Sequence, residues 1–201
     1  MSDTVALGFR AKTGRAIVVA LADGSKGPRL LWRREASLVD PRRDATTGPY
    51  HEVMELPWEE SLVAVQPLLL LIERAARTAV ASLVREVIEG KGHVRAIGIV
   101  GSLDRPLQKI GNPHIRAHAA EGILFRRVIE SAAEHEGIRY RTFSEKDIRE
   151  RAAASRIASH LQAIGKAAGP PWRADERAAA AAAWLALQSA DAKNHAVPLV
   201  R

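Results

Sequence analysis

The sequence predicts an α/β fold in which helices flank one mixed sheet of five strands. Three observations support this prediction. Apolar segments of strand length gather near the N-terminus, with turn residues between them. The apolar run 94–101 follows a long helical segment, as expected for a central strand buried on both faces. Helical and strand patterns then alternate, which favours parallel strands, and 201 residues suit a single domain.

The first three strands are predicted at residues 5–9, 16–21 and 30–39. Turn-forming residues separate them, at 11–14 and again at 23–28, where glycine, proline, aspartate and serine gather. Because short connections join neighbouring antiparallel strands, we expect a three-stranded antiparallel meander.

A long loop and a long helix are predicted next. Residues 40–57 contain three prolines and a glycine, and loops of this length are often functional or mobile. Helical periodicity then runs from about Trp58 to about Ile88, with Pro67 marking either a kink or a late start. A right-handed crossover through this helix makes the fourth strand parallel to the first.

The second half of the chain is predicted to alternate between strands and helices. We expect a domain spanning residues 1–192, followed by a tail at 193–201. The elements are a strand at 94–101, a loop at 102–113, a helix at 117–136, a strand at 138–143, a helix from 144 to about 168 and, after a Gly-Pro-Pro-Trp break, an alanine-rich helix at 177–189.

The composition excludes several classes of protein. The chain contains no cysteine, which rules out disulfides, thiolate metal sites and a cysteine nucleophile. That composition fits a reducing cytoplasm. No apolar run reaches the roughly 18 residues of a membrane span, and the N-terminus lacks the pattern of a signal peptide. We therefore expect a cytoplasmic protein without a membrane partner.

The net charge favours polyanions as partners. Thirty basic residues against 23 acidic ones give a formal charge of +7 and an isoelectric point near 10.2. Such a charge raises the encounter rate with nucleic acid. An arginine-rich and alanine-rich composition is also typical of GC-rich genomes, so the charge alone leaves both explanations open.

The order and spacing of four segments resemble a known family. The segments are LGFRAKTGRAIVVAL, RAIGIVG, AHAAEGILFRRVIESAAEHEGIRYRTFSEKDIR and RADERAAAAAAWLAL. Together they resemble the first hairpin, the fourth strand, the next helix and strand, and the last helix of the Holliday-junction resolvase (RuvC-like) branch of the ribonuclease H-like superfamily. The resemblance spans most of the chain and implies a ribonuclease H-like fold.

In that family, acidic residues on the first strand, the fourth strand and the last helix hold two divalent metal ions for phosphodiester hydrolysis. The resemblance carries the first-strand position onto Arg10 and the fourth-strand position onto or near Gly98, and neither residue is acidic. Asp104 substitutes for the second acid if its loop folds inward. The last-helix acids fall on Asp175 and Glu176. The resemblance therefore implies a degenerate site, with Asp175, Glu176 and Asp104 as candidate catalytic residues and Mg²⁺ as the cofactor if any activity survives.

Asp175 and Glu176 have two further interpretations. Acidic residues before a helix complement its dipole and cap its free N–H groups. Alternatively, Arg10 pairs with Asp175 or Glu176 and supplies a built-in cation where the family holds metal, because unpaired buried carboxylates are costly. The register of the first strand decides whether Arg10 occupies that position.

His114, His118 and Glu121 form a second candidate site. On a helix these three residues share a face, and the His-x-x-x-His spacing is compatible with metal binding. Pro113 can also place His114 before the helix, in which case these are polar residues beside the cleft. We therefore expect the metal ligands to come from Asp175, Glu176, Glu121 and His118.

Clusters of cations are the candidate nucleic-acid contacts. They lie in the first hairpin and in the two long loops, where they can position a phosphate backbone without reading its sequence. The alternative is a solvated basic face. The candidate residues are Arg10, Lys12, Arg15, Arg105, Lys109 and Arg116.

These observations predict a degenerate resolvase-type protein that binds structured nucleic acid with weak or no catalysis. One alternative is an active Mg²⁺-dependent endonuclease, and another is a structural or interaction protein of the same fold without a nucleic-acid role. The apolar run 68–72 exceeds a single amphipathic stripe, which also predicts a homodimer.

Overall fold

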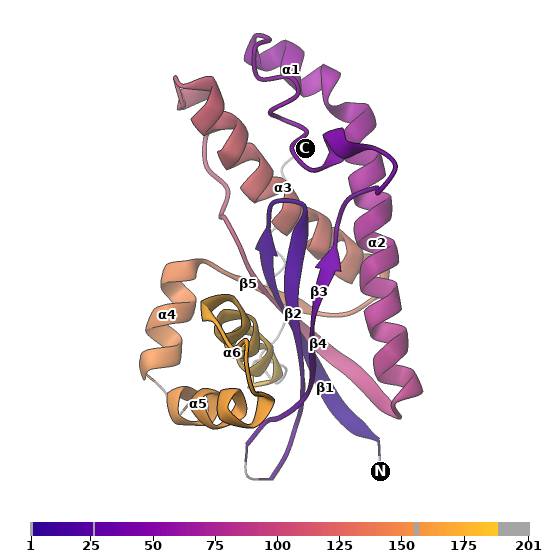
Figure 1. Ribbon diagram of the computed structural model, residues 1–201, viewed down its shortest axis with the longest axis vertical. Helices are drawn as coiled ribbons and strands as arrows, with labels where there is room; N and C mark the ends of the chain where they lie inside the picture. The colour runs from indigo at the N-terminus through magenta and orange to yellow at the C-terminus, as the bar shows by residue number, and fades with distance from the viewer. Residues whose placement is uncertain (1, 26, 155–156, 189–201) are drawn as a thin grey trace.

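A mixed sheet of five strands runs through the centre of the computed structural model, which describes residues 2–25, 27–154 and 157–188 (Figure 1). The strand order is β3-β2-β1-β4-β5. β1 pairs antiparallel with β2 and parallel with β4, so the predicted meander and crossover are confirmed. The strands are β1 (Asp3–Lys12), β2 (Arg15–Ala22), β3 (Arg29–Ser37), β4 (Gly92–Val100) and β5 (Tyr140–Phe143).

Helices cover both faces of the sheet (Figure 1). The long helices α2 and α3 pack on one face, and α6 packs on the other with α4 and α5 beside it. The helices are α1 (Trp58–Ala64), α2 (Gln66–Glu89), α3 (Pro113–His135), α4 (Glu145–Ala154), α5 (Ile157–Ala168) and α6 (Ala174–Gln188), with short 3₁₀ turns η1 (Asp44–Thr46) and η2 (Leu107–Lys109). No helix in the described ranges has both the length and the apolar character needed to cross a bilayer.

The two-residue period of β1 sorts its side chains between these two layers. Leu7 and Phe9 are fully buried in the core under α2 and α3. Ala6 lies in the core under α6. Arg10, on the same side of the strand as Ala6, therefore points towards the α6 layer. This register places the charged end of β1 beside the start of the last helix.

Paired glycines bring α6 unusually close to the sheet. Gly8 of β1 and Gly98 of β4 are partners in the parallel ladder. A Cβ atom added at Gly8 would lie 1.8 Å from the carbonyl oxygen of Ala179, and one at Gly98 would lie 2.1 Å from that of Ala182. The alanines of α6 supply a flat surface that fits this close approach. The alanine-rich sequence of the last helix thus has a packing function.

Several predicted boundaries were wrong. α3 begins at Pro113, because proline is well tolerated in the first turn, where its missing N–H costs no hydrogen bond. Two helices, α4 and α5, replace the single one predicted from 144 to 168. The helix at Trp58 ends at Ala64 and a new one begins at Gln66, so Pro67 marks a late start. The predicted tail at 193–201 lies outside the described residues.

Candidate functional site

The charged end of β1 meets the start of α6 in a cluster of four side chains, the β1–α6 cluster: Arg10, Lys12, Glu145 and Asp175. The Nε of Arg10 lies 3.4 Å from Oδ1 of Asp175, and the Nζ of Lys12 lies 3.2 Å from Oδ2. Arg10 also donates through NH2 to Glu145, at the first residue of α4. Each oxygen of the Asp175 carboxylate therefore faces a cation from β1.

Of the two acidic partners considered for Arg10, the structure pairs it with Asp175. The Arg10 side chain is only 12% exposed, whereas Asp175 is 36% exposed. Arg10 additionally donates to the backbone carbonyl of Ala11 at 3.1 Å, which fixes its guanidinium. The charges come from β1, α4 and α6, so the cluster joins three elements that are distant in the sequence.

These residues do not fit a divalent metal centre. Mg²⁺ requires several oxygen ligands in near-octahedral geometry. Here Asp175 is already bound by two cations, and a guanidinium and an ammonium would repel a metal ion. At the fourth-strand position, Gly98 has no room for any side chain, because α6 lies directly above it. The β1–α6 cluster therefore offers an ion pair where the family resemblance implied metal ligands.

Glu176 has a separate, structural contact. It is nearly buried, and its carboxylate accepts a hydrogen bond from the backbone N–H of Arg173 at 2.9 Å. Arg173 immediately precedes α6, so this bond is the return half of a capping box. The interpretation of Glu176 as a helix N-terminal residue accounts for its position.

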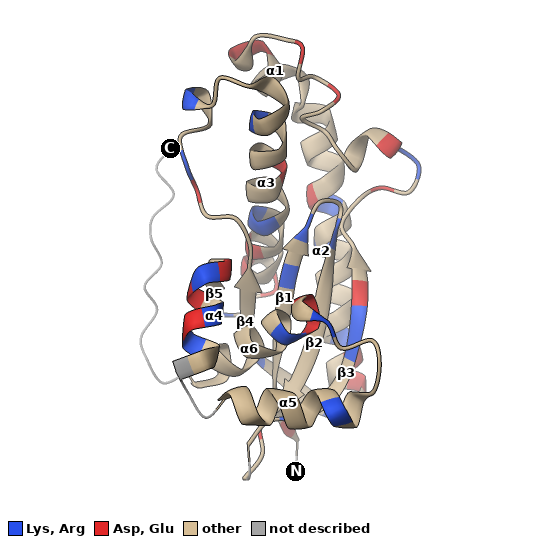
Figure 2. Cartoon of the chain, turned by 60° about the vertical axis from the view of Figure 1, so that its left-hand side comes forward, with Lys and Arg blue, Asp and Glu red and all other residues tan. Residues whose placement is uncertain are grey.

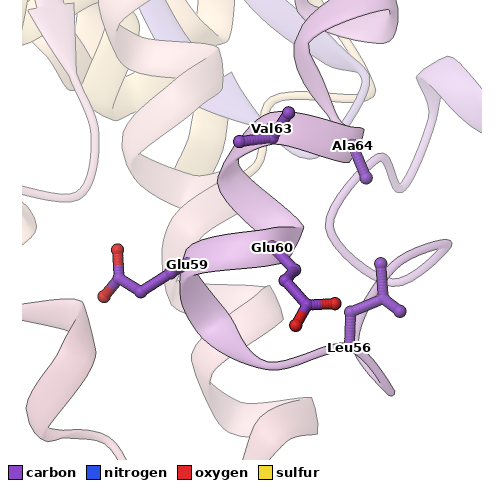
Figure 3. A pocket seen from close by; sticks show the side chains of 5 residues that line it. All are labelled: Leu56, Glu59, Glu60, Val63 and Ala64. Carbon is purple, nitrogen blue, oxygen red and sulfur yellow. The ribbon is translucent and has the colours of Figure 1, made fainter.

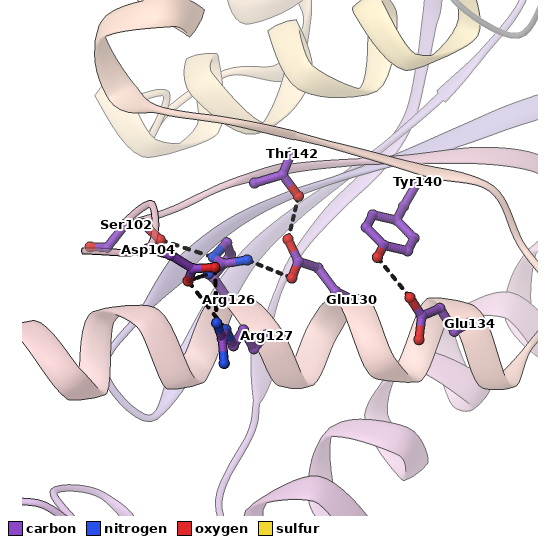
Figure 4. A network of polar contacts seen from close by, with 8 residues as sticks. All are labelled: Ser102, Asp104, Arg126, Arg127, Glu130, Glu134, Tyr140 and Thr142. Carbon is purple, nitrogen blue, oxygen red and sulfur yellow. Dashed lines mark hydrogen bonds and ion pairs between the residues drawn. The ribbon is translucent and has the colours of Figure 1, made fainter. Parts of the chain in front are cut away.

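Asp104 is held by α3, the helix on the opposite face of the sheet from α6 (Figure 4). Arg127 donates to it at 2.9 Å, and the nearly buried Arg126 donates to it as well. Arg126 also bonds the carbonyl of Ser102 at 2.9 Å and Glu130 at 2.6 Å. The hydrogen bond from Arg127 lowers the pKa of Asp104 below its ordinary value. Its loop thus binds α3 and does not bring Asp104 to Asp175.

His118 and Glu121 meet a residue that the sequence did not reveal. Nδ1 of His51 lies 2.7 Å from Oε1 of Glu121, and the ring of His51 lies against the rings of His114 and His118. Within the described part of the chain, His51, His114 and His118 form the one group of three or more potential metal ligands. His51 lies in the long loop before α1, and no pattern there relates it to α3.

The predicted nucleic-acid contacts fall into two classes. Arg10 and Lys12 belong to the β1–α6 cluster, Arg15 pairs with Glu35 at 3.2 Å, and Arg116 lies over the ring of Trp58 at 5.2 Å. Arg105 and Lys109 are exposed, and neither forms an ion pair within residues 2–25, 27–154 and 157–188.

The exposed cations gather at one end of the sheet, where β1, β3 and β4 finish. β1, β3 and β4 all run in the same direction, so the turn after β1 and the loops after β3 and β4 leave the same end. Figure 2 shows basic residues on both loops and on the neighbouring end of α3. We call the exposed basic residues of the two loops the loop cations: Arg42, Arg43, Arg105 and Lys109.

A shallow depression of about 480 Å³ lies on α1, lined by Leu56, Glu59, Glu60, Val63 and Ala64 (Figure 3). Its two glutamates point to different sides of the helix. The depression therefore lacks the convergent polar groups that a small-molecule site requires.

Comparison with known proteins adds evidence on the fold. No protein-family model and no curated protein sequence matches the chain. A structure of T. thermophilus RuvC in complex with a Holliday junction substrate matches at 12% identity and a TM-score of 0.52, covering 90% of each chain. A second Thermus thermophilus RuvC structure matches at 13% identity and the same TM-score, covering 90% of this chain and 92% of that one. The chain therefore has the ribonuclease H-like fold that it shares with RuvC.

Proposed function

We propose that this protein binds structured nucleic acid, of the branched kind, and does not hydrolyse it through a metal centre at the β1–α6 cluster. One observation carries the second half of this proposal. Asp175 is neutralised by Arg10 and Lys12, so the cluster cannot collect the oxygen ligands that two Mg²⁺ ions require.

The loop cations support the binding half. They lie at the same end of the sheet, on the loop after β3 and on the loop after β4. Exposed arginine and lysine side chains without acidic partners are the groups that contact phosphates and position a nucleic-acid backbone. The structural neighbour RuvC is described in complex with a Holliday junction. A four-way junction is therefore the first substrate to test.

Nucleic-acid binding is expected to depend on Arg105 and Lys109. Fluorescence anisotropy with a labelled, immobile four-way junction should give saturable binding that weakens steeply as salt rises, because bound counterions are released. The double variant Arg105→Ala/Lys109→Ala should bind more weakly, and the slope of log affinity against log salt should fall by roughly 1 per lost phosphate contact. Arg85→Ala is a matched control, since Arg85 is an exposed cation on α2.

Three outcomes separate this proposal from its alternatives. Binding without cleavage in Mg²⁺ supports it. Mg²⁺-dependent cleavage that Asp175→Ala abolishes would favour the active endonuclease, with Glu176, Asp104 and Glu121 as its other acids. Absence of junction binding even at low salt would favour an interaction protein with no nucleic-acid role. A cytoplasmic location belongs to the same proposal and rests on the cysteine-free sequence.

We further propose that a second copy of the chain covers α1 and the start of α2. Val63 and Leu70 are 74% and 65% exposed, and only Ile72 of the apolar run 68–72 is fully buried. Leu70 shares a stripe of α2 with Arg74 and Arg77, whereas Val63 follows Glu59 by one turn of α1. A two-fold arrangement would set the acidic helix of one copy against the basic stripe of the other.

The double variant Val63→Glu/Leu70→Glu is expected to be monomeric, because it places four additional acidic groups in a two-fold interface. Light scattering after size-exclusion chromatography measures the mass directly. The wild type should have twice the mass of the variant. A wild type that remains at 21.8 kDa at concentrations of tens of micromolar would contradict the dimer.

A further inference from the structure

Three histidine side chains converge where the loop between β3 and α1 crosses the first turns of α3. We call His51, His114 and His118 the histidine cluster. One ring nitrogen from each lies within 4.8 Å of the others. Ring centroids are 4.4 to 5.1 Å apart and every pair of rings meets edge to face. Three imidazoles that face a common point form a set of nitrogen donors.

α3 supplies two of these rings because of how it begins. Pro113 occupies the first turn, and the side chain of Asn112 caps the helix by accepting a hydrogen bond from the N–H of Ile115 at 3.0 Å. His114 is therefore inside the helix. His114 and His118, four residues apart, then project from the same face. This is the spacing at which a helix presents two metal ligands.

Glu121 orients the third ring. Its side chain is 1% exposed, and Oε1 lies 2.7 Å from Nδ1 of His51 and 3.3 Å from the backbone nitrogen of His51. This contact occupies Nδ1 of His51 and leaves Nε2 as the ring nitrogen that can face the other two imidazoles. Metal-binding histidines commonly donate their second N–H to a carboxylate in this way.

The loop that carries His51 is held in place by neighbouring aromatic residues. Tyr50 stacks on Trp58 with ring centroids 5.9 Å apart, and the guanidinium of Arg116 lies 5.2 Å from the Trp58 ring centroid. His51 therefore lies in a segment whose residues on either side, Tyr50 and Trp58, pack against each other and against Arg116 of α3.

We propose that the histidine cluster binds one transition-metal dication, with Zn²⁺ as the physiological candidate, through His51, His114 and His118, and with Glu121 as the positioning residue for His51. Three neutral imidazoles suit Zn²⁺, Co²⁺, Ni²⁺ and Cu²⁺, whereas Mg²⁺ requires oxygen ligands. The proposal does not depend on nucleic-acid binding, because none of its residues belongs to the loop cations or to the β1–α6 cluster.

The geometry requires only a small closure around the metal. Tetrahedral zinc with Zn–N distances of about 2.0–2.1 Å places its nitrogens about 3.4 Å apart. His114 and His118 are exposed and can rotate to bring their nitrogens together, whereas Glu121 holds His51. The same exposure leaves the fourth ligand position open to water, as in three-histidine sites that do chemistry.

Calorimetric titration of the full-length, tag-free protein with Zn²⁺ tests the site. We expect one ion per chain, and Co²⁺ in place of Zn²⁺ should give the visible absorption of a tetrahedral complex. His114→Ala and His118→Ala, at exposed positions that should fold normally, should each weaken Zn²⁺ binding at least tenfold. Glu121→Gln should weaken it about 10- to 100-fold. Mg²⁺ should not compete for the site.

His93→Ala is the matched control, because His93 is an exposed histidine on β4 outside the cluster. It should bind Zn²⁺ as the wild type does. The proposal is overturned if the wild type binds no Zn²⁺ at concentrations up to about 100 μM. A dissociation constant of that size corresponds to a binding free energy of roughly 5.5 kcal/mol. Binding that survives both His114→Ala and His118→Ala, or that His93→Ala removes, would overturn it equally.

Discussion

Replacing Gly98 with alanine is expected to lower the free energy of unfolding by about 3 kcal/mol, the upper end of the usual cost of overpacking a core. The added Cβ would lie 2.1 Å from the carbonyl oxygen of Ala182 and 3.0 Å from its side chain. Neither the central strand nor the backbone of α6 can yield without losing contacts along the whole helix. Urea denaturation followed by circular dichroism measures the loss.

Gly111→Ala is the matched control for this substitution. Among the described residues, apart from its two chain neighbours, none has an atom within 4 Å of a Cβ built at Gly111, so the free energy of unfolding should change by no more than about 0.5 kcal/mol. If Gly98→Ala were as stable as Gly111→Ala, the close packing of α6 on Gly8 and Gly98 would be contradicted. The position of Asp175, which depends on that packing, would be contradicted with it.

Arg10→Asp is expected to destabilise the protein by about 2 kcal/mol and to create no Mg²⁺ site. The change removes a nearly buried cation and places three carboxylates together, with Lys12 as their remaining cation. Breaking a buried ion pair costs about 3–5 kcal/mol. The lower figure expected here reflects the partial exposure of Asp175, which water screens.

Arg15→Asp provides the comparison, because Arg15 is on the same hairpin and pairs with Glu35, but its side chain is 52% exposed. Surface pairs contribute about 0–1 kcal/mol, so this variant should be nearly as stable as the wild type. Thermal denaturation with and without Mg²⁺ measures both properties. An Arg10→Asp protein that is fully stable would contradict the replacement of metal by Arg10. One that Mg²⁺ stabilises strongly would contradict the expected absence of a Mg²⁺ site in this variant.

The fold could be predicted from the sequence because local patterns of apolar and turn-forming residues determine most of its elements. Apolar run length and turn residues located the strands of the sheet, and the short connections together with the expected crossover predicted the meander and the parallel fourth strand. The start of α3 was not accessible, since Pro113 is as compatible with a first helical turn as with a loop. The pairing of Gly8 with Gly98 could not be predicted either, because the sequence of neither strand determines the register between β1 and β4.

The candidate site was accessible only in part. The pairing of Arg10 with Asp175 was one of the interpretations of the sequence, and it rested on the family resemblance, which sets the first strand beside the last helix. The capping contact of Glu176 was one of the interpretations that the sequence left open, because acidic residues in a first helical turn commonly cap it. The position of Asp104 did not follow, because its ion pairs with α3 depend on tertiary structure. His51 lies 63 residues before His114 in an irregular loop, so only the tertiary structure brings them together.

Arg10 and Lys12 are proposed to take the place of metal ions beside Asp175. Titration of the wild type and of Asp175→Ala with Mg²⁺ in a calorimeter tests this claim most directly. We predict that neither protein gives a saturable heat of binding at millimolar Mg²⁺, the range in which Mg²⁺-dependent enzymes load their metal. Saturable Mg²⁺ binding by the wild type that Asp175→Ala removes would contradict the claim and favour the active endonuclease.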